Sequence, residues 1–295
     1  MAAQGYDIIE APDSIALSNE GKIIWQLHHR QAEGKPYFHP LATTEGQVFS
    51  DLRPKDHPWH RGLWFSWKKI NGINYWEESR KTGVSEGLTK LLKIRRSVAP
   101  DNTVTVEMKL AYAPAKTGTV AMTEERTVTI HPPNDSGVYA IDWSATFQSL
   151  ESDVVLDRTP LPEQPGGKRG GGYAGLSLRM NKDVHGGVFF NSEELSGTEA
   201  NRKSARWISY SAPQGGSILM LDHPRNLRYP GKYYFVEKMP FMMPAVIHDA
   251  PHTIEAGKTL RLSYRTIVFP ERADGDSAEK SWKEWVNGTT YMNAR

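Results

Sequence analysis

The stretch VTVEMKL, residues 104–110, decides the fold class because apolar and polar side chains alternate along it. Successive side chains of a β-strand point to opposite faces, so this alternation predicts a strand with one buried face. The same alternation or a similar apolar run recurs at Val128 and Ile130, at Tyr139, Ile141 and Trp143, and in SILMLD (217–222) and TLRLSYRTIVF (259–269).

Turn chemistry separates these predicted strands. Asn-Asp-Ser-Gly at 134–137 and Glu-Ala-Gly-Lys at 255–258 are typical of tight connections, and 19 Pro and 25 Gly punctuate the chain. Many short strands with frequent turns predict an all-β fold, a large antiparallel β-sandwich. We expect one domain over residues 1–295. Its tail, 274–295, is expected to be helical, because Trp282, Trp285 and Val286 fall on one helix face.

Composition narrows the class of protein. With 38% hydrophobic and 24% charged residues, the 295-residue chain has a soluble, globular balance. A net charge of +2 argues against a nucleic-acid binder, and no apolar run reaches the roughly 20 residues that span a bilayer. The absence of Cys excludes disulfides and thiolate sites. The start, MAAQGYDIIEAPDS, lacks signal-peptide features, so we expect a cytoplasmic location, or a periplasmic one if a leader has been removed.

One short stretch, Asp56 to Gly62 (DHPWHRG), concentrates chemistry. Its proline and glycine predict a loop, and loops on a rigid β scaffold commonly carry sites. His57 and His60 are three residues apart, so an irregular turn could aim both rings at one point. Asp56 could orient a ring through its second nitrogen. A polar loop whose histidines bond backbone groups is the simpler alternative.

Three other stretches strengthen the interpretation of this loop as a site. They are YFHPL (37–41), with His39; LDHPRN (221–226), with Asp222, His223 and Asn226; and GYAGLSLR (172–179), which follows the glycine-rich run 165–172. Polar residues at predicted strand ends can be gathered around one concave face of a sandwich. We therefore expect the histidine stretches to converge in one pocket, and the glycine-rich run to form a mobile loop or a lid.

Five stretches together resemble the PmoA-like family of bacterial proteins, labelled "methane oxygenase PmoA" and also known as a domain of unknown function. They are PYFHPL, DHPWHRGLWFSW, GGGYAGLSLR, ARWISYSA and LDHPRNLRYP, in the family's order, and the resemblance covers about residues 14–270. The family often has a third histidine inside D-H-x-x-H, where this chain has Trp59. The oxygenase activity is not expected, since particulate methane oxidation belongs to a membrane complex.

The resemblance implies a galactose-mutarotase-like β-supersandwich, a fold that mostly handles carbohydrates. The first hypothesis is therefore a lyase, hydrolase or epimerase acting on a sugar or glycoside. Histidine suits proton removal and delivery near neutral pH. The expected acid/base groups are His57 and His60, with His39 and His223 nearby. The expected substrate-binding residues are Arg53, Asp56, Arg61, Trp76, Tyr173, Arg179, Trp207, Asp222 and Asn226.

Two alternatives stay open. The cofactor is unknown, but the four histidines with Asp56 or Asp222 could bind a divalent metal. A non-catalytic sugar-binding module would use the same aromatic and arginine side chains. The expected partner is a carbohydrate or another small molecule. The apolar residues Tyr233–Phe235 and Pro240–Pro244 could be core, pocket wall or a homo-oligomer contact.

Overall fold

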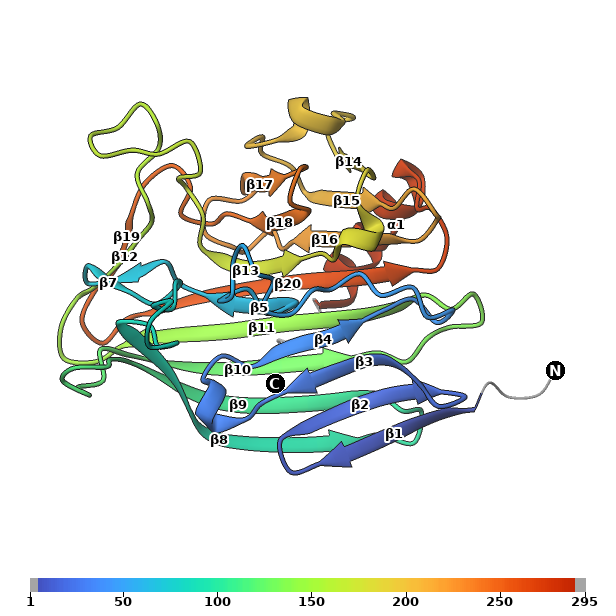
Figure 1. The fold of residues 1–295 in the computed structure, drawn as a ribbon, viewed down its shortest axis with the longest axis horizontal. Helices are drawn as coiled ribbons and strands as arrows, with labels where there is room; N and C mark the ends of the chain where they lie inside the picture. The colour runs from blue at the N-terminus through green and yellow to red at the C-terminus, as the bar shows by residue number, and fades with distance from the viewer. Residues whose placement is uncertain (1–4, 290–295) are drawn as a thin grey trace.

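The computed structural model describes residues 5–289 as two eight-stranded antiparallel sheets, one small sheet and a C-terminal helix (Figure 1). The first sheet has the strand order β1 (Tyr6–Ala11), β2 (Ser14–Asn19), β3 (Lys22–His28), β4 (Tyr37–Leu41), β5 (Leu63–Ser66), β13 (Gly175–Arg179), β18 (Phe241–Pro244) and β17 (Tyr233–Val236). The second has the order β14 (Val188–Asn191), β15 (Trp207–Ser211), β16 (Ser217–Asp222), β20 (Thr259–Phe269), β11 (Tyr139–Ser149), β10 (Met122–Ile130), β9 (Val104–Pro114) and β8 (Gly87–Val98).

The remaining elements are short. A four-stranded sheet orders β19 (His252–Ile254), β12 (Val154–Asp157), β6 (Lys69–Ile70) and β7 (Ile73–Asn74). Three 3-10 helices, η1 (Gln31–Glu33), η2 (Lys182–Val184) and η3 (Gly197–Ala200), lie in connections, and helix α1 spans Gly275–Thr289. Among residues 5–289, no helix is long and apolar enough to cross a membrane.

The alternating stretches form the centre of the second sheet. VTVEMKL lies in β9, which pairs antiparallel with β10, and β10 pairs with β11. Strand β20 coincides with TLRLSYRTIVF, and β16 with SILMLD. Gly137 N donates to Asn134 O, and Lys258 N donates to Glu255 O, as the turn residues predict. The prediction of a large antiparallel β-sandwich with a short C-terminal helix is confirmed.

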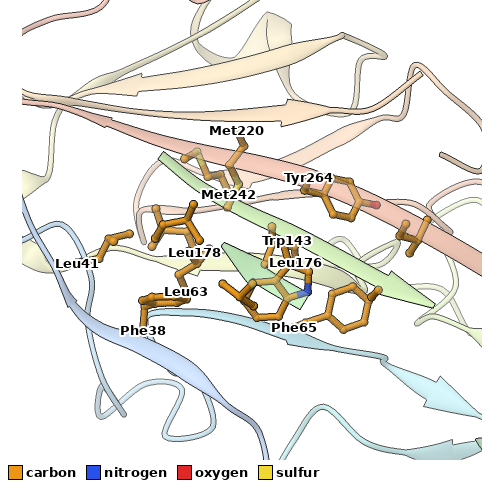
Figure 2. Packing of buried hydrophobic residues seen from close by; sticks show 14 of the residues in the cluster. Phe38, Leu41, Leu63, Phe65, Trp143, Leu176, Leu178, Met220, Met242 and Tyr264 are labelled. Atoms are coloured by element: carbon orange, nitrogen blue, oxygen red, sulfur yellow. The ribbon is translucent and has the colours of Figure 1, made fainter. Parts of the chain in front are cut away.

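The core lies between the two large sheets, and Figure 2 shows side chains from both of them meeting there. On β5, Leu63 and Phe65 enter this core, whereas Trp64 points to the outer face of the first sheet. On β16, Ile218 and Met220 point inward. The period of two thus separates each sheet into a core face and an outer face. Replacing one such buried Leu by Ala typically costs about 2–5 kcal/mol.

One charged pair lies inside this core. Glu124 and Arg126, two residues apart on β10, are both fully buried and joined at 2.6 Å between Arg126 Nε and Glu124 Oε1. The Tyr112 hydroxyl donates to the same carboxylate. The Arg126 guanidinium carbon lies 4.5 Å from the centre of the Trp143 ring. The two charges are therefore compensated by each other and by an aromatic face.

The outer faces of the two sheets are covered differently. Helix α1 covers part of the second sheet, where Trp207, Leu219 and Leu221 pack with Ala278 and Trp285. The predicted helix face is confirmed, since Trp282 and Val286 pack on the same cluster as Trp285. Residues 290–295 of the predicted tail lie outside the described residues. Part of the outer face of the first sheet is covered by loop residues Leu52, Trp59 and Trp76, which pack with Tyr37, Trp64 and Phe241.

The glycine-rich run 165–172 is a hydrogen-bonded loop. Gly172 N donates to Thr159 O, and the Arg202 side chain donates to the carbonyls of Arg169 and Gly171. A Cβ on Gly171 would lie 2.1 Å from Pro160 O, so only glycine permits this close approach. The glycine content therefore reflects tight packing of the backbone. A lid function for this loop stays a prediction.

Candidate functional site

The loop Asp56–Gly62 folds back on itself over the first sheet. Arg53 N donates to His60 O, and His60 N donates to His57 O. Gly62 has a φ of +61°, and a Cβ there would lie 2.1 Å from Phe38 O, so the loop enters β5 only with glycine at this position. This compact turn stacks the His57 and His60 rings, with centroids 4.6 Å apart and planes inclined by 22°.

Asp56 joins the loop to the sheet below it. Its two carboxylate oxygens accept hydrogen bonds from Arg179 Nη2 on β13 at 2.9 and 3.0 Å, and Oδ2 lies 3.0 Å from His57 Nδ1. Burial alone would raise the pKa of Asp56, but the neighbouring His57 and Arg179 outweigh it and lower the pKa to about 2. Asp56 is therefore a carboxylate paired with Arg179 and close to His57 Nδ1, an atom that makes no well-directed hydrogen bond within residues 5–289.

His60 lies beneath His57 in an aromatic cluster. Its ring centre is 5.1 Å from that of Trp64, 5.3 Å from that of Phe241 and 6.2 Å from that of Trp76. Burial, followed by the charges of His57 and Arg179, lowers the pKa of His60 to about 2. Within residues 5–289, His60 Nδ1 finds no hydrogen-bond partner. His60 is thus a neutral ring supporting a half-exposed one.

The aromatic cluster continues to a second set of polar groups. Trp76 is 5.0 Å from Tyr173 between ring centres. The Tyr173 hydroxyl donates to Glu77 Oε1 at 2.8 Å, and Lys68 Nζ pairs with Glu77 Oε2. Burial would raise the pKa of Glu77, but Lys68 lowers it overall. Tyr173 and Tyr234 are partly exposed, so their rings are available to a ligand on this face.

Arg53 and Arg61 point toward a different place from the two histidines. Both pair with Glu78, Arg61 through Oε1 and Arg53 through Oε2, the latter at 2.9 Å. They line a pocket of about 400 Å³ next to η1 and the start of β8. The buried Lys35 also lines it, and Lys35 Nζ donates to Trp76 O at 3.0 Å. Burial, and then Arg61, lowers the pKa of Lys35 to about 7.

A protein-family model covers residues 14–283, almost the whole of this architecture; its description is "Family of unknown function (DUF6807)". The chain belongs to this family. No curated protein sequence matches the chain.

Several solved structures have a similar arrangement over more than nine-tenths of this DUF6807 chain. A glycoside hydrolase family 97 enzyme variant from Pseudoalteromonas sp. strain K8 matches with 7% identity and a TM-score of 0.42, over 91% of this chain and 36% of that one. Slr1438 from Synechocystis sp. PCC 6803 matches with 7% identity and a TM-score of 0.41, over 91% and 97%. The α-N-acetylgalactosaminidase NagBb from Bifidobacterium bifidum matches with 12% identity and a TM-score of 0.38, over 98% and 38%. The chain spans little more than a third of both glycosidases, and the fold assignment rests on the strand pairing described above.

The expected convergence of the histidine stretches is wrong for this DUF6807 protein. His223 packs against Trp285 of α1, with ring centres 5.2 Å apart, on the outer face of the second sheet. His57 and His60 lie on the outer face of the first sheet, with the whole core between. The alternation of side chains along β16 explains this position. Leu219 and Leu221 point away from the core, and the chain continues past Asp222 on the side that α1 covers.

The other residues of the LDHPRN stretch have structural partners. Asp222 accepts from Asn226 Nδ2 at 2.7 Å and from Gly231 N at 2.8 Å, and burial raises the pKa of Asp222 to about 6. Asn226 also exchanges two hydrogen bonds with the backbone of Ser263. Trp207 donates from Nε1 to Glu279 Oε2 on α1. This cluster ties the loop after β16 to the helix and to β20.

His39 Nδ1 lies 2.9 Å from Ser50 Oγ, and His39 O lies 2.8 Å from His28 Nε2, so its acid/base role stays a prediction. Trp76 is only 3% exposed, so its ring packs within the outer-face cluster and is not an open platform. The apolar run late in the chain divides, since Tyr233, Phe235 and Met242 enter the core, while Phe241 and Met243 join the outer-face cluster beside His60.

The side chains do not fit a histidine metal site. In the described part of the chain, no group of three or more His, Asp or Glu side chains is arranged to hold a metal ion. The expected ligand set is divided between opposite faces of the sandwich, and His57 and His60 face each other as stacked rings.

Four residues of this region escaped the sequence analysis: Lys35, Lys68, Glu77 and Glu78. Glu77 and Glu78 directly follow Trp76, which was the only predicted site residue in this stretch of the sequence. Lys35 and Lys68 are lysines that only burial distinguishes from surface charges.

Proposed function

We propose that this chain is a carbohydrate-active enzyme, a lyase, hydrolase or epimerase, with His57 as its general acid/base. The observation that supports it is the connected set Arg179, Asp56 and His57 on the outer face of the first sheet. In the proposed mechanism, a small rotation of the ring turns the 3.0 Å contact between Nδ1 and the Asp56 carboxylate into a hydrogen bond, which leaves Nε2 to exchange a proton with a substrate. The His57 side chain is 36% exposed, enough for a substrate to reach it.

The neighbouring residues have supporting roles in this proposal. His60 stacks beneath His57 and stays neutral, so it adds no charge that would oppose protonation of the upper ring. Arg179 fixes Asp56 and has two further buried donor atoms, Nε and Nη1, without a hydrogen-bond partner in residues 5–289. Partly exposed aromatic rings, such as those of Trp59 and Tyr173, offer apolar faces of the kind that line small-molecule sites.

The test is a screen of glycosides and glycuronides with the wild type and three variants. His57→Ala should lower turnover of any substrate found by about 10²–10⁴-fold, the usual contribution of a positioned acid/base group. His131→Ala is the matched control, because His131 forms a similar pair with Asp142 at 2.8 Å on the second sheet.

Equal turnover in His57→Ala and wild type would contradict the assignment of His57. A sugar that binds without product formation would instead indicate a binding module. Asp56→Asn should lower turnover less than His57→Ala, because it weakens the orientation of the ring and leaves the ring in place.

A further inference from the structure

The pocket behind the histidine loop has polar groups that lack partners. It is lined by η1, by Lys35, Arg53, Arg61 and Glu78, and by the start of β8. It has a volume of about 400 Å³, within the usual size of small-molecule sites. His57 and His60 are not among its lining residues, so it is distinct from the proposed catalytic group.

Three of its lining residues have buried polar atoms without a hydrogen-bond partner in the part of the chain that the structure describes: Arg61 Nε, Thr89 Oγ1 and Glu33 Oε2. Arg61 and Thr89 are 3% and 4% exposed. Buried polar atoms are almost always satisfied, so three orphans around one pocket indicate a polar ligand. Arg61 Nε requires an acceptor, Glu33 Oε2 can accept a hydrogen bond beside the one that Tyr37 gives to this carboxylate, and the Thr89 hydroxyl can serve as either.

The charges that line the pocket indicate the sign of the ligand's charge. Four cationic side chains, of Lys35, Arg53, Arg61 and Lys90, line it with two carboxylates, of Glu33 and Glu78. Glu78 is already shared between the two arginines. Lys35 Nζ makes one hydrogen bond, to Trp76 O, although an ammonium group can donate three. The lining therefore has an excess of cationic donors.

We infer that this pocket binds a sugar acid, a small molecule with one carboxylate and several hydroxyl groups. On binding, the lining side chains turn toward the ligand, so that its carboxylate pairs with Lys35 and Arg61 and its hydroxyls bond Glu33 and Thr89. A charged donor facing a carboxylate gives a strong hydrogen bond, and hydroxyls satisfy atoms that would otherwise stay orphaned. This inference stands without the proposed function, because the pocket is lined by other residues than His57 and His60.

The test is isothermal titration calorimetry of the wild-type chain with sodium D-glucuronate, sodium D-galacturonate and sodium D-gluconate, with D-glucose as the neutral control. We expect at least one sugar acid to bind and glucose to bind at least about tenfold more weakly, since it lacks the charged hydrogen bonds. Absence of binding by all three acids, or equal binding of glucose, would overturn the inference.

Two variants locate the binding. Lys35→Met should weaken it about tenfold or more, and Thr89→Val about threefold, because the first removes a charged donor and the second a neutral hydroxyl. Lys93→Met, on the exposed side of β8, and Thr105→Val, on β9, are the matched controls and should bind as the wild type does. Thr89→Val removes only an orphaned hydroxyl, so it tests the site even if Lys35→Met does not fold. Unchanged affinity in Thr89→Val and in any folded Lys35→Met would overturn the inference.

Discussion

Asp-His-Pro occurs at residues 56–58 on the outer face of the first sheet and again at residues 222–224 beside α1. The first carboxylate is half-exposed and its pKa is lowered to about 2, because the neighbouring His57 and Arg179 outweigh the effect of burial. The second is buried and its pKa is raised to about 6, because burial outweighs hydrogen bonds from Gly231 and Asn226. The same tripeptide is thus available to a ligand at one place and part of a helix contact at the other.

What differs is the cover that each place receives. Trp282 and Trp285 of α1 close the second place, and Trp282 Nε1 donates to Asp222 O at 3.0 Å. The first Asp-His-Pro stretch, residues 56–58, is covered by loop residues alone, and these leave His57, Trp59 and Tyr173 partly exposed. Polar residues at strand ends therefore become a candidate site only where no secondary-structure element seals them.

The largest expected effect concerns His60, the neutral ring of the first place. Unfolded His60 gains a proton below pH 6.5, whereas folded His60 stays neutral until about pH 2, so its contribution to stability falls as the pH decreases from 6.5. His60→Phe removes this loss and keeps an aromatic ring among Trp64, Trp76 and Phe241. The free energy of unfolding of the variant minus that of wild type should therefore be about 3 kcal/mol larger at pH 4 than at pH 8. This follows from about 1.4 kcal/mol for each pH unit.

Urea unfolding at several pH values between 8 and 4 measures this difference. His131→Phe is the control, since His131 is half-exposed and paired with Asp142. A constant difference between His60→Phe and wild type over the whole range would contradict a buried neutral His60.

The second prediction compares the two Asp-His-Pro histidines directly at pH 7. His223→Ala should lower the free energy of unfolding by about 2 kcal/mol, because it opens a cavity against Trp285 and removes the acceptor of Arg225 N. His57→Ala should cost less than about 1 kcal/mol, because its ring is partly in water. Guanidinium unfolding monitored by circular dichroism checks both, and equal costs would remove the contrast between the two places.

The third prediction concerns the pH dependence of Asp222. Its folded pKa, about 6, lies above the unfolded value of 3.8, so its contribution is fully present below pH 3.8 and is lost as the pH rises through 6. Asp222→Asn should remove a loss of about 2 kcal/mol between pH 4 and pH 7, in addition to a change in stability that does not depend on pH. Carbon NMR titration of the aspartate carboxyl groups provides a second measurement, and a signal of Asp222 that titrates below pH 4 would contradict the prediction.

Five strands of the second sheet, β9, β10, β11, β16 and β20, could be predicted from local pattern alone. Alternation from Val104 to Leu110 and turn chemistry at 134–137 and 255–258 depend only on neighbouring residues. The face that each strand presents, and what then covers it, depend on pairing between distant segments. Pairing of β5 with β13, for example, joins Leu63 to Leu178, more than 100 residues away.

The candidate site was accessible to sequence reasoning only in part. The cluster Asp56, His57, His60 and Arg61 is contiguous in sequence, and the structure keeps the two histidines together. The interpretation failed where it assumed that similar motifs share a face, as for His223. Lys35 has no neighbour in sequence that marks it, because its burial comes from segments that reach it only in the folded chain.

The Glu124–Arg126 pair in the core has a consequence for the order of folding. The two residues are on the same strand and the same face, so they can pair as soon as β10 is extended, without closing a long loop. The contacts between the two sheets, by contrast, join residues far apart in the chain and form slowly. The two charges can therefore neutralise each other locally while still hydrated, and the sheets then close over a pair that is already formed.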